Sequence, residues 1–214
     1  MLGRSNMGGR MGVDFHHLHE TRRERARGRG LRSPARGFSL VELFVTLGVL
    51  SILTAVSIPL ITSTINASRI TGSANEFVAA LQLARMESIR RNVRVLVCES
   101  SDGLSCTGGA QWRGWVVFAD RNQNGLVDVD EQINSGRVEA PLLARSSGNI
   151  GNRILFRSDG LAYLNNQLLN GNMRLCMATT QPTENARDVR IAAGSRMSVG
   201  PATNVGVACA APPN

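Results

Sequence analysis

Residues 36–61 read RGFSLVELFVTLGVLSILTAVSIPLI, and this stretch decides the fold of the N-terminal part of the chain. The run from Phe38 to Ile61 holds 24 residues with a single formal charge, at Glu42. As an α-helix rising about 1.5 Å per residue, it would span roughly 36 Å, enough to cross the hydrocarbon core of a bilayer. The stretch therefore predicts a transmembrane helix over residues 38–61.

The charge of the chain is concentrated before this run. Residues 1–37 hold nine arginines and three acidic residues, whereas the whole 214-residue chain has a formal net charge of +8. Basic residues flanking a membrane helix stay on the cytoplasmic side, so residues 1–37 are expected in the cytoplasm and the rest outside it. The high overall charge is therefore no evidence for a basic surface on the remainder of the chain, which would need local evidence.

The four cysteines are Cys98, Cys106, Cys176 and Cys209, all beyond the apolar run. An even number of cysteines on the outer side of a membrane favours disulfides in an oxidising compartment, with free buried thiols as the alternative. No C-x-x-C pair occurs, and all three histidines precede the run. The cysteines are therefore not expected to bind zinc.

Glu42 is the feature that a simple membrane anchor leaves unexplained. A cleaved secretory signal peptide fits poorly, because its apolar core is usually about 7–15 residues long. A carboxylate in a membrane costs a few kcal/mol unless it is paired or neutralised. Cleavage between Gly37 and Phe38 would create a free amine close to Glu42 in the sequence, and such a cation is a suitable partner.

The motif RGFSLVE, with Arg36, Gly37, Phe38 and Glu42 in place, resembles the type III signal of type IV pilins and type II secretion pseudopilins. This resemblance implies that a prepilin peptidase cuts after Gly37 and methylates the new N-terminal Phe38. It also implies that Glu42 pairs with the amine of a neighbouring subunit during assembly by an inner-membrane platform. The expected partners are other pilins or pseudopilins in a helical filament.

Beyond the apolar run, the sequence predicts an α+β domain. Ala74, Phe77, Leu81 and Ala84 recur at helical spacing, which indicates an amphipathic continuation of the helix over residues 62–92. Residues 93–214 then read as a β-rich head, because alternation with period two replaces the helical pattern. We expect one antiparallel sheet packed on the helix, with strands at 93–100, 112–119, 153–157, 161–164, 173–180, 188–193 and 196–200.

The strand positions favour two particular cysteine pairs. Cys98 and Cys106 bracket a Gly/Ser-rich turn, so a bridge between them would close a short loop. Cys209 lies in a Pro/Ala-rich tail, and a bridge to Cys176 would pin that tail to the sheet. Other pairings remain open from the sequence alone.

The order of motifs resembles the GspH/FimT branch of pilin-like proteins, which includes the H pseudopilin of type II secretion and the minor pilins FimT and FimU. The resemblance is carried by VLVC (95–98) and WRGWVVFADRNQNGLVD (112–128), and it covers most of residues 36–200. It implies a single-pass protein of the bacterial inner membrane with a periplasmic C-terminal domain. The subunit would then move into a pilus or a secretion pseudopilus.

The stretch DRNQNGLVDVDE (120–131) matches the calcium-loop pattern D-x-[DN]-x-[DN]-G-x5-E. Oxygen ligands would come from Asp120, Asn122, Asn124, Asp128 and Glu131. However, calcium hands are flanked by helices, whereas this loop follows a predicted strand. An exposed turn without metal is the alternative, since such connections favour the same residue types.

A second candidate is a group of C-terminal arginines, Arg187, Arg190 and Arg196, with Arg174 as an additional candidate. Minor pilins of the FimT type are associated with DNA uptake in natural transformation through a G-R-x-R motif. The matching stretch here, 194–198, retains one of its two arginines. DNA binding is thus an alternative function, and a solvated arginine face is the simpler interpretation.

No catalytic pattern is expected after processing. The part of the chain from Phe38 onward has no histidine. Its carboxylates show no pattern of a catalytic pair that differs from the acidic residues common in turns. The sequence therefore predicts a non-enzymatic assembly subunit, and it leaves open whether the filament is a pilus or a secretion pseudopilus.

Overall fold

The computed structural model describes residues 37–202 and 209–214. The predicted leader, residues 1–37, therefore lies outside the described residues except for Gly37. The chain divides into two units between Leu43 and Phe44, and only residues 37–43 of the first unit are described. The first unit contributes the start of the one long helix, α1, and the second contributes the rest of α1 and all the strands.

Helix α1 runs from Leu40 to Arg91, close to the predicted range 38–92. Its start is capped by Ser39, whose hydroxyl accepts a hydrogen bond from the Glu42 amide at 3.1 Å. The residue after its end, Asn92, adopts a left-handed conformation with φ of 53°. Arg90 and Arg91 in the last turn favour this end, because cations stabilise the negative pole of the helix.

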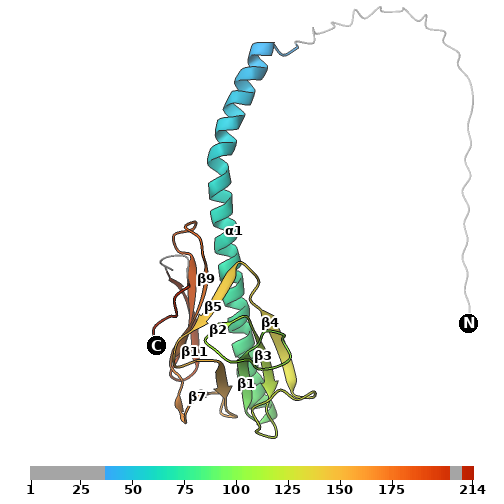
Figure 1. The fold of residues 1–214 in the computed structure, drawn as a ribbon, viewed down its shortest axis with the longest axis vertical. Helices are drawn as coiled ribbons and strands as arrows, with labels where there is room; N and C mark the ends of the chain where they lie inside the picture. The colour runs from blue at the N-terminus through green and yellow to red at the C-terminus, as the bar shows by residue number, and fades with distance from the viewer. Residues whose placement is uncertain (1–36, 203–208) are drawn as a thin grey trace, which may run out of the picture. The chain divides into compact units, whose positions relative to one another are not determined.

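Within the described residues, eleven strands follow α1 and form two antiparallel sheets (Figure 1). The six-stranded sheet has the order β4-β3-β1-β6-β7-β8, with β1 Val95–Glu99, β3 Gly114–Ala119, β4 Gln132–Arg137, β6 Arg153–Phe156, β7 Ala162–Leu164 and β8 Gln167–Leu168. The five-stranded sheet has the order β11-β10-β9-β5-β2, with β2 Gln111–Trp112, β5 Leu142–Ser146, β9 Gly171–Met177, β10 Ala186–Ala192 and β11 Arg196–Ala202.

Two details correct the sequence-based expectation within the α+β fold. The expected single sheet is two sheets, and the expected strand 112–119 is divided at Arg113. Trp112 pairs with Ala144 in the second sheet, whereas Gly114 pairs with Arg137 in the first. The sequence pattern does not reveal this change of sheet at Arg113, because residues on both sides of it have the pattern of a strand.

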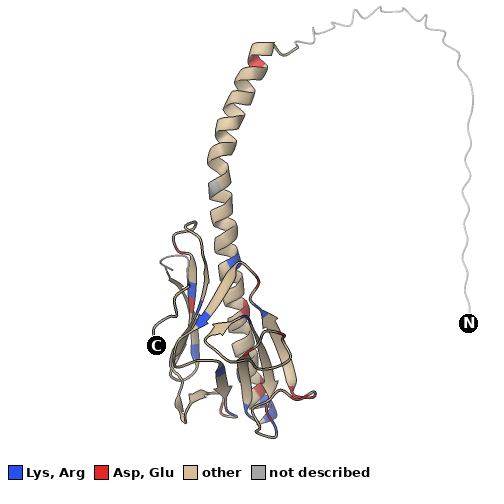
Figure 2. Ribbon diagram, viewed as in Figure 1, with Lys and Arg blue, Asp and Glu red and all other residues tan. Residues whose placement is uncertain are grey.

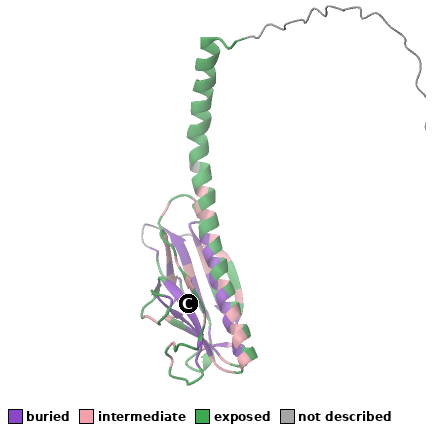
Figure 3. Ribbon diagram, turned by 90° about the vertical axis from the view of Figure 1, so that its right-hand side faces the viewer, coloured by how far each residue is buried: buried purple, intermediate pink, exposed green. Residues whose placement is uncertain are grey.

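The core is formed where α1 packs on both sheets. The buried positions of α1 include Ile70, Ala74, Phe77, Leu81 and Ala84, which confirms the predicted stripe. Of these, Ala74, Phe77, Leu81 and Ala84 share one hydrophobic cluster with residues of both sheets, such as Val97 and Val117 of the first and Leu175 and Val189 of the second. Figure 3 shows buried residues along one face of this half of the helix and on the strands that face it.

Two disulfides tie loop and tail segments to inner strands of the two sheets, β1 and β9. One joins Cys98 to Cys106 across eight residues, and the other joins Cys176 to Cys209 across 33 residues. These are the pairs that the sequence favours. The C-terminal end is held further by the Asn172 side-chain amide, which donates to the Pro213 carbonyl at 2.7 Å.

Candidate functional site

The first candidate site is the start of α1, where the processing and assembly residues lie. Gly37 and Phe38 are exposed, and the Phe38 side chain is 83% accessible. Ser39 and Glu42 form the S-x-x-E pattern of a capping box, in which the acidic residue also faces the positive pole of the helix. Glu42 therefore has a local role at the start of the helix. A test of its role in assembly has to distinguish the two effects.

The apolar part of α1 is exposed along its length. Its large side chains from Phe44 to Ile61 remain more than half accessible, and no charged residue occurs between Glu42 and Arg69 (Figure 2). The helix is long and apolar enough to cross a membrane by length and composition. Exposed apolar surface of this extent marks a site that lipid or other helices cover.

The second candidate site is the β3–β4 connection, residues 120–131. Its five predicted calcium ligands do lie in one loop, but at different depths. Asp120 and Glu131 are buried, whereas Asn122, Asn124 and Asp128 are exposed. Asp120 accepts from the Arg94 Nε at 2.7 Å and Asp128 accepts from the Asn122 side-chain amide at 2.7 Å. Among the described residues, no group of three or more His, Cys, Asp or Glu is arranged to hold a metal.

The third candidate site, the arginine set, is divided between two faces of the second sheet. Residues directly opposite in paired strands share a face, and alternate residues of one strand point to opposite faces. Arg190 lies opposite Ser198, and Arg196 lies opposite Ala192, so both arginines occupy the same exposed face. Arg187 points to the other face, where its guanidinium lies 3.9 Å from the Glu184 carboxylate.

Arg174 is on the face of Arg190 but is already paired. Its Nε and Nη2 donate to the Asp188 carboxylate at 2.7 and 2.8 Å. This bidentate hydrogen bonding raises the pKa of Arg174. Arg190 and Arg196 are thus the two members of the predicted set that the geometry leaves available to an external anion.

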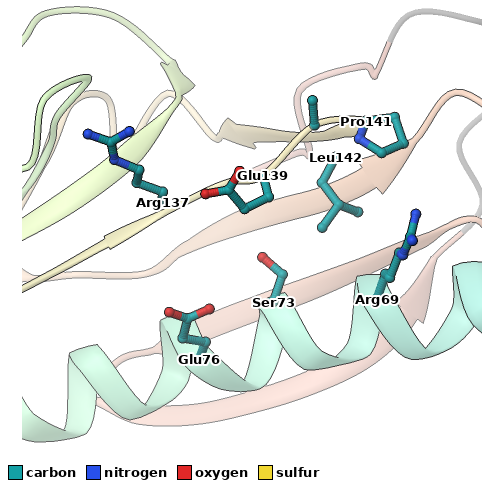
Figure 4. A pocket seen from close by; sticks show the side chains of 8 residues that line it. Arg69, Ser73, Glu76, Arg137, Glu139, Pro141 and Leu142 are labelled. Atoms are coloured by element: carbon teal, nitrogen blue, oxygen red, sulfur yellow. The ribbon is translucent and has the colours of Figure 1, made fainter.

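A pocket of about 390 Å³ was not anticipated from the sequence (Figure 4). Arg69, Ser73 and Glu76 of α1 line one side, and Arg137 and Glu139 near the β4–β5 connection line the other. The Ser73 hydroxyl is buried without a hydrogen-bond partner. These residues are far apart in the sequence and match no motif, so only the packing of α1 on β4 and β5 brings them together.

Comparison with known proteins shows the family of the chain. The family model for the type II transport protein GspH matches residues 73–195. The chain belongs to the GspH family. The match covers the last part of α1, from residue 73, and the strands up to the β10–β11 turn, so the family is defined here by the head and not by the apolar run.

Two named relatives share 24–29% of their residues with the chain over the aligned parts. The pilin-like protein PilA1 of Thermus thermophilus is 29% identical over 100 residues, which is 47% of this chain and 58% of PilA1. The chain therefore spans less than two thirds of that relative. The type IV major fimbrial protein FimA of Dichelobacter nodosus is 24% identical over 150 residues, covering 66% of this chain and 86% of FimA.

Solved structures with a similar chain path include two minor subunits. The type IV minor pilin FimU of Pseudomonas aeruginosa aligns with a TM-score of 0.45 at 17% identity, covering 63% of this chain and 90% of FimU. The minor pseudopilin EpsH of the Vibrio cholerae type 2 secretion system aligns with a TM-score of 0.45 at 15% identity, covering 62% and 97%.

Proposed function

We propose that this GspH-family chain is a non-enzymatic subunit, a minor pilin or pseudopilin, of a type IV pilus or a type II secretion pseudopilus. The observation that carries the proposal is the exposed apolar half of α1, which begins with the motif RGFSLVE. Membership of the GspH family and the similarity to the pilin-like PilA1 support it. The genes adjacent to this one would separate the two kinds of filament.

Processing is the first step of the proposed function. A prepilin peptidase cuts between Gly37 and Phe38 and methylates the new amine, and the leader 1–37 is removed. The exposure of Gly37 and Phe38 is consistent with access by a peptidase. The Ser39 cap is retained after the cut, so α1 keeps a stabilised start.

Membrane insertion is the second step. Residues 38–61 span the inner membrane, residues 62–92 continue the helix outside it, and the head 93–214 faces the periplasm. The excess of arginines before the run and the two disulfides after it support this orientation. Both observations point to the same side for the head, although they rest on different residues.

Assembly is the third step. An unpaired carboxylate in the membrane costs roughly 3 kcal/mol, so Glu42 favours a position where a cation neutralises it. The amine of Phe38 on a neighbouring subunit is such a cation. Packing of the exposed apolar helices against one another supplies the cohesion of the filament, and the Glu42–amine pair fixes the stagger between subunits.

The test compares Glu42→Gln and Glu42→Val in cells that produce the full chain. Gln still fits the capping box but carries no charge, whereas Val supports neither role. We expect both variants to insert and to be cut at Phe38, but to lose cross-links to other filament subunits at least tenfold. Glu76→Gln, an exposed acid further along α1, is the matched control and is expected to assemble normally.

Normal assembly of Glu42→Gln would contradict the pairing role. If Glu42→Gln assembled and Glu42→Val failed, the side chain would act as a helix cap and not as a docking group. Cleavage and insertion are measured in the same samples, so a processing defect is distinguished from an assembly defect.

DNA binding for natural transformation is a second candidate function, and the shared face of Arg190 and Arg196 favours it. Within the described residues, neither guanidinium forms an ion pair with an acidic side chain. A gel-shift of the full-length protein in detergent compares the wild type with an Arg190→Ala/Arg196→Ala variant. Arg187→Ala, on the opposite face of the same strand, is the control. Equal, weak and salt-insensitive binding by all three would eliminate this function.

A further inference from the structure

The β3–β4 connection contains two buried carboxylates, and in each of them one oxygen has no hydrogen-bond partner. Asp120 is 1% exposed and Glu131 is 5% exposed. The Oδ1 of Asp120 and the Oε2 of Glu131 are both buried without a hydrogen-bond partner. Buried carboxylate oxygens are normally hydrogen-bonded or bound to a metal, because losing water without compensation is costly.

The other oxygen of each carboxylate is anchored by the backbone of the loop itself. The Gly125 amide donates to Asp120 Oδ2 at 3.0 Å, and the Arg121 amide donates to Glu131 Oε1 at 2.7 Å. The Ala119 amide donates to the Glu131 carbonyl at 2.8 Å and closes the neck of the loop. Both carboxylates are therefore held by amides of the same loop, one at its first position and one at its twelfth.

We propose that this loop binds a calcium ion, with Asp120 Oδ1 and Glu131 Oε2 as its two fixed ligands. A hard divalent cation satisfies both orphan oxygens at once, since calcium takes carboxylate, amide and carbonyl oxygens at about 2.3–2.6 Å. The proposal concerns the head alone, so it stands or falls independently of filament assembly.

The remaining ligands come from the exposed part of the loop. Asn122, Asn124 and Asp128 occupy the third, fifth and ninth positions, and the Leu126 carbonyl occupies the seventh. Gly125 takes the sixth position with φ of 72°, where the sharp turn of a calcium loop requires glycine.

The exposed ligands are held by one another in the structure. The side-chain amides of Asn122 and Asn124 donate to the same oxygen of Asp128, at 2.7 and 3.1 Å. Calcium binding exchanges these hydrogen bonds for coordination by the amide oxygens and Asp128. Because this part is exposed, it can rearrange without disturbing the core.

The local charge sets the expected affinity. Asp120, Asp128 and Glu131 supply three negative charges, and Arg94 offsets one of them through its ion pair with Asp120. Arg121 in the loop reduces the field further. We therefore expect a dissociation constant of about 10⁻⁴–10⁻³ M, the range of extracellular calcium modules.

The test is calorimetric titration of full-length protein in detergent micelles, after treatment with a chelator, with CaCl2 and separately with MgCl2. We expect saturable calcium binding at one site, much weaker magnesium binding, and a rise in Tm of a few degrees at 10 mM calcium. Asn124→Ala alters an exposed ligand and should weaken calcium binding at least fivefold with the fold intact. Glu131→Gln should weaken it at least tenfold. Asp130→Asn, an exposed acid at the non-ligand eleventh position, should bind as the wild type does.

Three results would overturn the proposal. The first is the absence of any calcium-dependent heat or Tm shift up to 10 mM with folded protein. The second is equal binding of calcium and magnesium, or equal weakening by Asp130→Asn and Asn124→Ala, which would indicate a diffuse acidic surface. The third is unchanged calcium binding by Asn124→Ala and by folded Glu131→Gln.

Discussion

The ring of Phe77 meets the indole of Trp115 edge to face, with the ring centroids 5.4 Å apart and the planes inclined at 73°. The same ring lies 5.6 Å from Trp112, at 85°. Trp112 belongs to the five-stranded sheet and Trp115 to the six-stranded sheet. One side chain of α1 thus contacts both sheets at the corner where the chain passes from one to the other.

Replacing Phe77 by Ala is expected to destabilise the head by about 3–5 kcal/mol, because it leaves a cavity between two tryptophans that cannot close around it. Urea unfolding monitored by tryptophan fluorescence measures the loss. Met86→Ala on the exposed side of the same helix is the control and should change the free energy of unfolding by less than about 0.5 kcal/mol. Equal effects of the two substitutions would mean that Phe77 does not hold α1 on the sheets.

Gly136 of β4 is expected to tolerate no side chain. A Cβ at this position would overlap the indole of Trp115. Gly136→Ala should therefore lower the stability by about 1–3 kcal/mol, the usual effect of overpacking a core. Gly200→Ala in β11 is the control, since a Cβ there meets nothing within 4 Å. A Gly136→Ala variant that melts at the wild-type temperature would show that Trp115 has room to move.

Glu99 is expected to make the stability depend on pH. It is buried at 3% exposure, and this burial raises the pKa of its carboxyl. A raised pKa in the folded state means that protonation favours folding, so this contribution is present at low pH and is lost as the pH rises through the folded-state pKa. At neutral pH the folded protein therefore carries the cost of a buried charge.

Glu99→Gln removes that charge and keeps the shape of the side chain. In the wild type the Arg113 amide donates to Oε1 of Glu99 and the Thr107 hydroxyl donates to Oε2. In the variant the amide oxygen accepts from Arg113, and the Thr107 hydroxyl accepts from the side-chain NH2. We expect the variant to melt roughly 2 °C above the wild type at pH 7–8, with the difference shrinking toward pH 4. Glu139→Gln, at an exposed position, should show no such trend. A Tm difference that is constant with pH would exclude titration of Glu99 as the cause.

Much of α1 was predictable because two strong patterns lie end to end. The apolar run that ends at Ile61 and the stripe of 3.6-residue period after it both indicate a helix, and together they place its ends within two residues of Leu40 and Arg91. The hairpin at residues 153–164 was also predictable, since an S-D-G turn joins two short apolar runs. Gly160 there adopts φ of 74°, as such a turn demands.

The strands that the sequence analysis did not predict are those that depend on hydrogen bonding to a neighbouring strand. Strand β4 reads QINSGR, which contains Asn, Ser and Gly and has no large residue buried. It is a strand because β3 offers it a hydrogen-bonding edge, and β3 itself is fully buried. Strand β5 and the short β8 were missed for the same reason. Single-sequence patterns describe a strand's own side chains and not its neighbours.

The candidate sites show the same division. The residues at 36–42 and 120–131 are contiguous in the sequence, so their motifs could be read directly. The face shared by Arg190 and Arg196, and the exclusion of Arg187 from it, depend on strand register. The pocket between Ser73 and Glu139 depends on how α1 packs on the sheets. Neither arrangement has a signature in the linear sequence.

The central claim is that the mature chain begins at Phe38 with a free amine available to Glu42. Mass spectrometry of the N-terminal peptide, from full-length protein purified from the membranes of its native cell, tests this most directly. The proposal predicts a peptide that starts at Phe38, with the mass of one added methyl group on its amine. A mature protein that retains Gly37, or that begins at any other residue, would contradict it.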